Sequence, residues 1–172
     1  MGFFKKKATG SDIAEELFGF LTIVMFKPIE EFPPLTYLLE NTKLSEMEAR
    51  YEIFTYGAAI FDFVVRSKVS SRHHEAIFHD FYDKIKEALR ETRGEEAFQT
   101  HFIPRLEFYK EAIPKKKLPG GTPAIARVFL EVCEGKEGES IDDYNGFNKQ
   151  ATLLFSFFFD LATKKIKQYK IV

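Results

Sequence analysis

The segment that most constrains the fold of this chain is residues 46–67, where apolar side chains cover most of the circumference of a helix. Its main stripe has the spacing 4-3-4-3-4, which places every member on one helical face: Met47, Tyr51, Phe54, Ala58, Phe61 and Val65. A second apolar stripe beside it contains Ile53, Ile60 and Val64. The polar positions form only a narrow edge: Glu48, Glu52, Thr55, Asp62 and Arg66. An apolar arc this wide predicts a central helix that other helices surround.

Start and stop signals predict further helices along the rest of the chain. Ser45 and Glu48 have the capping-box spacing, in which the hydroxyl and the carboxylate each accept an N–H at the helix start. Gly94 can end a helix in the left-handed conformation, and Pro104 should kink or split the helical stretch 95–113. The remaining expected N-caps are Ser11 with Asp12, Ser71, Thr122 and Ser140. The predicted helices cover about 11–27, 33–42, 46–67, 71–93, 95–113, 122–134 and 140–167.

The helix pattern is accompanied by no internal repeat and by no alternating stretch long enough to argue for a sheet. It therefore predicts an all-α protein, a single-domain helical bundle of six to seven helices over residues 1–172. In this prediction residues 1–10 form a basic N-terminal tail, and residues 114–121 and 135–140 form loops. A domain of 172 residues buries roughly 70% of the surface of its unfolded chain.

The composition fits a globular chain with an unusual aromatic content. Apolar residues make up 45% and charged residues 30% of the sequence, which excludes a disordered chain. There are 20 Phe and 7 Tyr but no Trp, and this bias favours packing over hydrogen-bonded recognition because phenylalanine has no polar group. The net charge of -1 gives no overall field that would attract nucleic acid. We therefore expect no nucleic-acid partner.

Both ends of the sequence are basic, whereas the stretch between them is acidic. Lys5, Lys6 and Lys7 lie near the start, and four further lysines lie near the end: Lys164, Lys165, Lys167 and Lys170. The favoured interpretation is a pair of solvated tails that aid solubility. The alternative is a weak contact of these basic termini with an anionic membrane surface, where each lysine contributes about 1 kcal/mol.

Nothing in the sequence predicts a membrane-spanning or secreted protein. The apolar run at residues 17–26 is only about half as long as the roughly 20 residues that a spanning helix needs. Acidic residues separate this run from the lysines before it, and no small-residue cleavage site follows it. The single cysteine, Cys133, excludes an intramolecular disulfide framework. These features predict a cytoplasmic protein.

Three of the four histidines, His73, His74 and His79, lie close together in the sequence and raise the question of a metal site. On a helix they point in three directions, whereas metal ligands must converge on one point. The sequence also lacks both His-Glu-x-x-His and the tetrad of glutamates and Glu-x-x-His pairs that holds two metals in helical bundles. We therefore expect no metal and no cofactor.

His74 is the one histidine that falls on the apolar face of its helix, near Phe78. This position predicts a buried histidine with one hydrogen-bond partner. No nucleophile motif or phosphate-binding loop occurs in the sequence, so we do not expect an enzyme. The alternative is a catalytic site around His74, which would require a cleft and a second titratable group from another helix.

Two aspartates and the cysteine also need an interpretation, because each lies in an apolar stretch. Asp62 is followed four residues later by Arg66, and Asp160 by Lys164. Both pairs fall on polar stripes, which predicts solvated ion pairs worth a few tenths of a kcal/mol. Cys133 lies on the apolar side of its helix and is expected to be inert in the core.

The surplus of apolar helix surface favours a function through contacts. The helices at 45–67 and 141–167 are apolar over more than half of their circumference, and the helix at 11–27 nearly so. One six-helix domain seldom surrounds three such helices, so large apolar patches should remain exposed. We expect a non-enzymatic protein that acts through protein–protein interaction as a homodimer, with Phe155 and Phe159 as interface candidates. The alternative is a bundle that binds an apolar small molecule, such as an acyl chain or a lipid.

Overall fold

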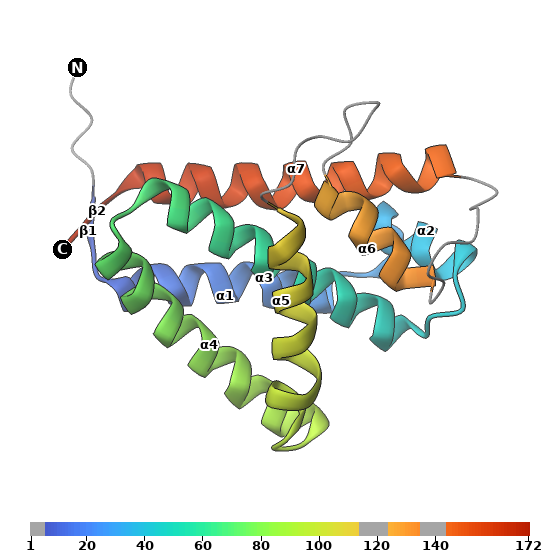
Figure 1. Cartoon of the computed structure of the whole chain (residues 1–172), viewed down its shortest axis with the longest axis horizontal. Coiled ribbons are helices and arrows are strands. Elements are labelled where there is room, and N and C mark those ends of the chain that lie inside the picture. The colour runs from blue at the N-terminus through green and yellow to red at the C-terminus, as the bar shows by residue number, and fades with distance from the viewer. Residues whose placement is uncertain (1–5, 114–123, 135–143) are drawn as a thin grey trace.

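The computed structural model describes residues 6–113, 124–134 and 144–172, and within these ranges the protein is almost entirely helical (Figure 1). These ranges contain seven α-helices: α1 Gly10–Phe26, α2 Pro33–Asn41, α3 Glu46–Lys68, α4 Ser71–Arg93, α5 Ile103–Ala112, α6 Ala124–Glu134 and α7 Tyr144–Gln168. A 3-10 turn covers Ile29–Glu31, and a π-helical turn covers Phe98–Phe102. The prediction of an all-α fold with six to seven helices is confirmed.

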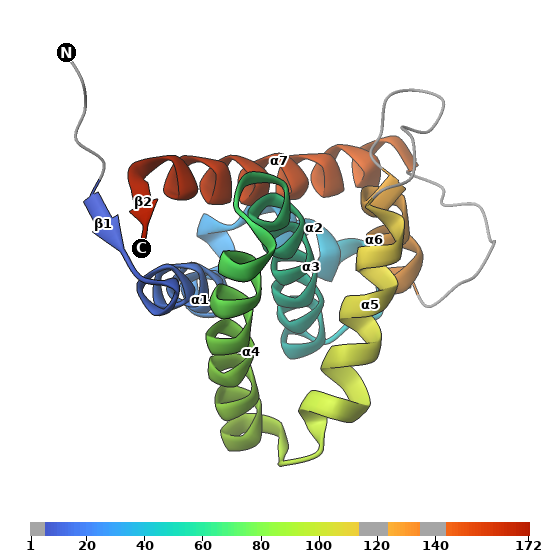
Figure 2. The same ribbon diagram turned by 60° about the vertical axis from the view of Figure 1, so that its left-hand side comes forward.

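Helix α3 lies at the centre of the molecule, as its wide apolar arc predicts. Nearly every residue from Ala49 to Val65 is buried, because α1, α5 and α7 pack along α3 and α4 covers a further edge (Figure 2). At Gly57 an added Cβ atom would lie 2.8 Å from side-chain atoms of Leu21 on α1 and of Phe158 on α7. Glycine is therefore required where these two helices approach α3, since any larger residue would overlap their side chains.

The clearest boundary signals in the sequence are confirmed. Ser45 and Glu48 form the predicted capping box at the start of α3, with the Ser45 N–H donating to Glu48 Oε2 at 2.8 Å. These hydrogen bonds lower the pKa of the Glu48 carboxyl group. Gly94 follows α4 with a φ of 95°, a backbone conformation that residues other than glycine rarely adopt.

Two predicted N-caps are wrong by one or two residues. Helix α1 is capped by Thr9 and not by Ser11, and Asp12 is the acidic residue that completes the capping box by accepting the Thr9 N–H at 2.7 Å. Helix α4 is capped by Ser70 and not by Ser71. In both cases two neighbouring residues have a side chain that can cap, so the sequence alone does not decide between them.

Pro104 splits the stretch 95–113, as predicted. The π-helical turn ends at Phe102, and the Ile103 N–H donates to the carbonyl of Phe98, five residues back. Helix α5 begins at Ile103 with Pro104, which has no N–H, in its first turn. The turn buries Phe98 and Phe102, and the Phe102 ring meets the Phe54 ring of α3 edge-on at a centroid distance of 6.3 Å. The contact of Phe102 with Phe54 thus holds this segment against the central helix.

The structure contains one feature that the sequence does not predict, a two-stranded parallel sheet. Strand β1 (Lys6–Ala8) pairs with β2 (Tyr169–Ile171), with Lys7 opposite Lys170. Part of the predicted N-terminal tail is therefore a strand. Three-residue strands are too short for an alternating pattern to stand out in the sequence. Their pairing brings the first and last described segments side by side (Figure 1).

Some expectations fall on segments that the structure does not cover. The predicted loops at 114–121 and 135–140 and the predicted caps Thr122 and Ser140 lie outside the described residues. Within the described ranges, every helix is too short or too polar to cross a membrane.

Candidate functional site

The first candidate is a buried carboxylate, Asp62, on the polar edge of α3. Its side chain is 2% exposed, so the prediction of a solvated ion pair is wrong, although Arg66 Nη2 does lie 2.5 Å from Asp62 Oδ2. Helices α4 and α5 each supply a further partner: His74 Nε2 lies 2.5 Å from Oδ1, and Lys110 Nζ lies 3.5 Å from Oδ2. The sequence pattern of α3 alone cannot predict this burial, because α4 and α5 cover Asp62.

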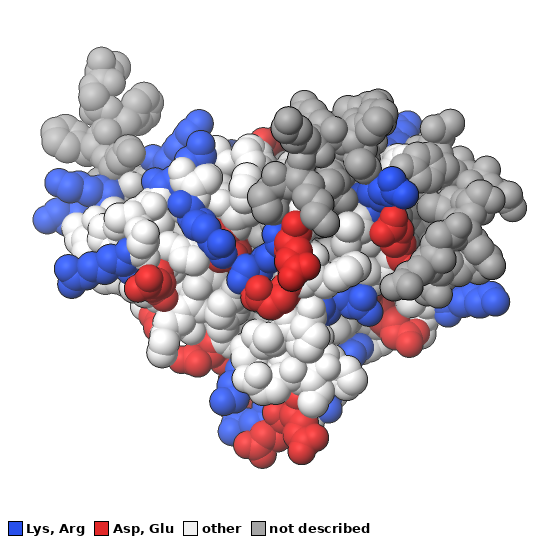
Figure 3. Space-filling model, viewed as in Figure 1, with Lys and Arg blue, Asp and Glu red and all other residues white. Residues whose placement is uncertain are grey.

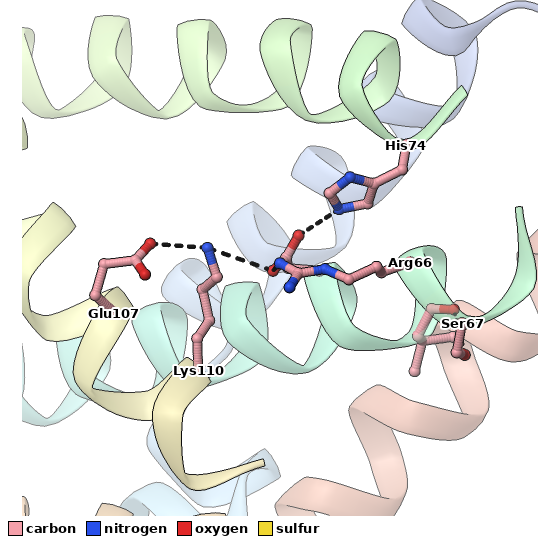
Figure 4. Close-up of polar contacts among 7 residues, drawn as sticks. Arg66, Ser67, His74, Glu107 and Lys110 are labelled. Carbon is pink, nitrogen blue, oxygen red and sulfur yellow. Dashed lines mark hydrogen bonds and ion pairs between the residues drawn. The ribbon is translucent and has the colours of Figure 1, made fainter. Parts of the chain in front are cut away.

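Asp62 and its partners form a junction between three helices. Figure 4 shows His74 from α4 and Lys110 from α5 pointing toward the same place on α3, beside Arg66. The His74 ring also stacks on Phe78, with the ring centroids 4.9 Å apart. Both carboxylate oxygens of Asp62 are thus paired with groups of the protein itself, as a buried charge requires. We interpret this junction as structural.

The other two histidines of α4 point away from this junction and from each other. His73 Nδ1 lies 3.2 Å from the hydroxyl of the α4 N-cap, and His79 Nδ1 lies 3.4 Å from carboxylate oxygens of both Asp80 and Asp83. In the described ranges no group of three or more His, Cys, Asp or Glu side chains could hold a metal ion. Cys133 is buried on α6.

A second buried carboxylate, Glu52, lies on the same polar edge of α3 and is 8% exposed. The Tyr109 hydroxyl of α5 donates to Glu52 Oε2 at 2.9 Å, and Arg105 Nε lies 3.3 Å from Oε1. Burial raises the pKa of the Glu52 carboxyl group, while the charge of Arg105 and the hydrogen bond from Tyr109 lower it by less. Carboxylates with raised pKa values are frequent in functional sites.

Glu52 lies in the wall of a cavity of about 550 Å³ between α3, the end of α4, α5 and α6. The charged part of the wall carries both signs, with Arg93 and Arg105 beside Glu48 and Glu52. The apolar part is formed by Leu44, Phe108 and Val132. The Arg93 guanidinium lies 4.0 Å from the centroid of the Tyr51 ring, and burial raises the pKa of Tyr51 to about 12. The volume suits a small-molecule site. The sequence did not reveal it because its walls come from four separate helices and two connecting segments.

The outer surface of α7 is the third candidate. The predicted interface residues Phe155 and Phe159 are half-buried and stack on one another, with ring centroids 5.8 Å apart. Two other apolar residues of α7 are more exposed, Leu153 at 51% and Phe157 at 49%. Helix α1 exposes two more large apolar side chains, Ile23 and Phe26. Helix α3 exposes one such side chain, Met47 at 59%, although the sequence places it on the main apolar stripe. Apolar surface therefore remains uncovered on all three helices for which the sequence predicts a surplus.

Leu153 and Phe157 belong to one stripe, which we call the α7 stripe. Its members have the spacing 4-4-3-4 and so share one face of the helix: Lys149, Leu153, Phe157, Asp160 and Lys164. All of them are exposed. Asp160 therefore faces solvent as predicted, in contrast to Asp62. The stripe has two apolar side chains at its middle. Lys149 lies on one side of them, and Asp160, followed by Lys164, lies on the other.

The chain matches no protein-family model, no curated protein and no solved structure. Its function is therefore inferred from the surfaces and cavities described above.

Proposed function

We propose that this protein acts through protein–protein contact as a homodimer, and that the α7 stripe is the contact surface. The observation that carries this proposal is the complementarity of the stripe with itself. When two antiparallel copies of α7 are related by a twofold axis at residue 155, Leu153 faces Phe157 of the second copy. The same axis places Lys149 opposite residue 161 of the second copy, which is the residue next to Asp160. One register thus gives apolar contacts at the centre and opposite charges at both ends.

The dimer is expected to depend on concentration. Leu153 and Phe157 are about half-covered in the monomer, so each contributes about half of the roughly 1.5–3 kcal/mol that full burial of such a side chain provides. Association itself costs several kcal/mol, which these contacts must exceed.

Sedimentation velocity over a range of protein concentrations tests this contact. Phe157→Glu places a charge on both sides of the twofold axis and is expected to give a folded monomer. Met47→Glu is the matched control, because Met47 is also exposed and lies in the first turn of α3, where an acidic residue suits the helix dipole. The control should associate like the unmodified protein. A Phe157→Glu variant that still dimerises would exclude the α7 stripe.

The interface role of Phe155 and Phe159 stays a prediction, and it has a distinct test. Both rings pack against the core, so Phe159→Glu is expected to lower the free energy of unfolding by about 1–3 kcal/mol, since it buries part of a charged group. If Phe159→Glu instead gives a stable monomer while Phe157→Glu remains a dimer, the contact lies on the Phe155–Phe159 side of α7.

A second function, the binding of a small amphipathic acid, is supported by the cavity beside Glu52. Arg105 is already paired with Glu52, whereas Arg93 forms no ion pair with a described residue and can pair with a ligand carboxylate. Phe108 and Val132 can cover an apolar tail. Calorimetric titration with decanoate tests this function. Arg93→Gln should weaken binding, and Arg90→Gln, a change at the neighbouring exposed turn of α4, should not. Absence of binding at about 1 mM decanoate would exclude this ligand class.

A further inference from the structure

Pairing of the two strands concentrates positive charge at one end of the molecule. Lys7 of β1 lies opposite Lys170 of β2, and the Val172 N–H donates to the carbonyl of Ala8 at 3.1 Å. The end of α3 and the start of α4 lie at the same end, and Figure 3 shows Lys and Arg side chains gathered there. Basic segments that are far apart in the sequence are thus neighbours in the fold.

A cavity of about 420 Å³ lies between the end of α3, the first turn of α4, the end of α7 and β2. Its charged wall consists of Lys68, Lys167 and Lys170, with His73 and Ser70 beside them. Its apolar wall contains Val69, Ile166 and Ile171. No carboxylate is among the described residues that line it. A concave surface with charges of one sign focuses the electric field and attracts an ion of the opposite sign.

Neighbouring carboxylates compensate other lysines at this end but not these three. Lys6 and Lys7 line a separate cavity together with Asp12, Glu15 and Glu16. Lys165, two residues before Lys167 on α7, pairs with Glu16 at 3.4 Å. By contrast, Lys68, Lys167 and Lys170 form no ion pair with any residue in the described ranges. Like charges around one cavity repel one another, and an anion bound there would reduce this repulsion.

We propose that this cavity binds a phosphate group carried by a larger polar molecule. Lysine ammonium groups act as point charges toward phosphate oxygens, and three of them around one cavity suit a group with three such oxygens. The first turn of α4, which contributes His73, adds the positive end of a helix dipole to the same wall. The volume leaves room for a sugar or polyol attached to the phosphate.

Titration with inositol trisphosphate, followed by calorimetry and by amide chemical shifts, tests the site. Binding should shift the amide signals of residues 68–73 and 166–171. The double variant Lys68→Gln/Lys167→Gln should bind at least about tenfold more weakly. The control variant Lys43→Gln/Lys86→Gln removes the same number of exposed lysine charges elsewhere on the surface, and its affinity should stay within about twofold of the unmodified protein.

Vesicles distinguish the two sources of such a phosphate. Sedimentation with phosphatidylcholine vesicles that contain phosphatidylinositol bisphosphate, reversed by free inositol trisphosphate, would identify a lipid headgroup. Binding of the free trisphosphate without any sedimentation would identify a soluble phosphorylated molecule. Either outcome supports the site.

Three outcomes would overturn the proposal. One is the absence of chemical-shift changes at about 1 mM inositol trisphosphate. Another is an equal loss of affinity in the site and control variants, which would show that total charge and not the cavity is responsible. The third is equal sedimentation with vesicles of the same charge made with phosphatidylserine, reduced equally by both double variants.

Discussion

Asp62 and Glu52 are both buried carboxylates on α3, but their surroundings differ. Asp62 has partners on both oxygens, and two of these partners come from other helices. Glu52 is paired with Arg105 and Tyr109, yet burial still raises its pKa. Folding therefore disfavours the ionised form of the Glu52 carboxyl group. Removing the charge should have different consequences at the two positions.

Asp62→Ala is expected to lower the free energy of unfolding by about 1–3 kcal/mol, because the half-buried His74 loses its partner and Lys110 keeps only Glu107. Urea denaturation followed by circular dichroism measures the change. Asp83→Ala, on the exposed side of α4, is the control and should change stability by no more than about 0.5 kcal/mol. Equal small effects at both positions would show that the junction does not hold the helices together.

Glu52→Gln is expected to change how stability depends on pH. The pKa of Glu52 is raised in the folded state above its ordinary value of 4.5, so between these two values the folded protein binds more protons than the unfolded chain. The free energy of unfolding of the unmodified protein should therefore fall as pH rises through this window. The variant lacks this contribution, so its stability relative to the unmodified protein should increase with pH.

Chemical denaturation of both proteins at several pH values measures the difference. Glu87→Gln, at an exposed position of α4, serves as the control. Its stability relative to the unmodified protein should not rise with pH. If the stability of the Glu52→Gln variant relative to the unmodified protein decreases with rising pH, the account of Glu52 is contradicted.

At the scale of elements, close packing of α1 and α7 against α3 determines the shape of the core. The contact depends on Gly57, where the side chains of Leu21 and Phe158 occupy the space that a Cβ atom would need. The rings of Phe61 and Phe158 meet edge-on nearby, with centroids 5.6 Å apart. Crowding of this kind leaves no room for a larger residue unless the helices separate.

Gly57→Ala is expected to lower the free energy of unfolding by about 1–3 kcal/mol through overpacking, despite the better helix propensity of alanine. Gly19→Ala on α1 is the matched control, because no atom lies within 4 Å of the position of its added Cβ. That change should raise stability by about 0.5–1 kcal/mol. Thermal or urea unfolding of both variants gives the comparison, and a stabilised Gly57→Ala protein would contradict the crowding.

Helices were predictable from this sequence because their signals are local. The stripe of α3, the capping box at Ser45 and the breaks at Gly94 and Pro104 act within one helix or turn. The burial of Asp62 and Glu52 was not predictable, because it arises where α4 and α5 cover a polar edge of a different helix. The same holds for the pairing of β1 with β2, which joins segments at opposite ends of the chain.

At the scale of the whole molecule, α7 contributes to both proposed surfaces at different positions. The α7 stripe extends from Lys149 to Lys164, whereas the lysine-lined cavity lies near Lys167 and Lys170. Dimerisation through the stripe and phosphate binding at the cavity can therefore be tested separately. The dimer proposal is the more specific of the two, because a single register of the two α7 helices must pair both the apolar and the charged residues of the stripe.

Sedimentation equilibrium of two charge variants, alone and mixed, tests the homodimer most directly. Lys149→Asp and Asp160→Lys each place like charges at both ends of the contact, which should weaken it by about 1–3 kcal/mol, or roughly 5- to 150-fold. Each variant alone should therefore sediment as a monomer at concentrations where the unmodified protein is a dimer. An equimolar mixture should form a dimer, because each heterodimer has opposite charges at both ends. A mixture that stays monomeric while the unmodified protein dimerises, or an unmodified protein that is monomeric up to about 300 µM, would contradict the proposal.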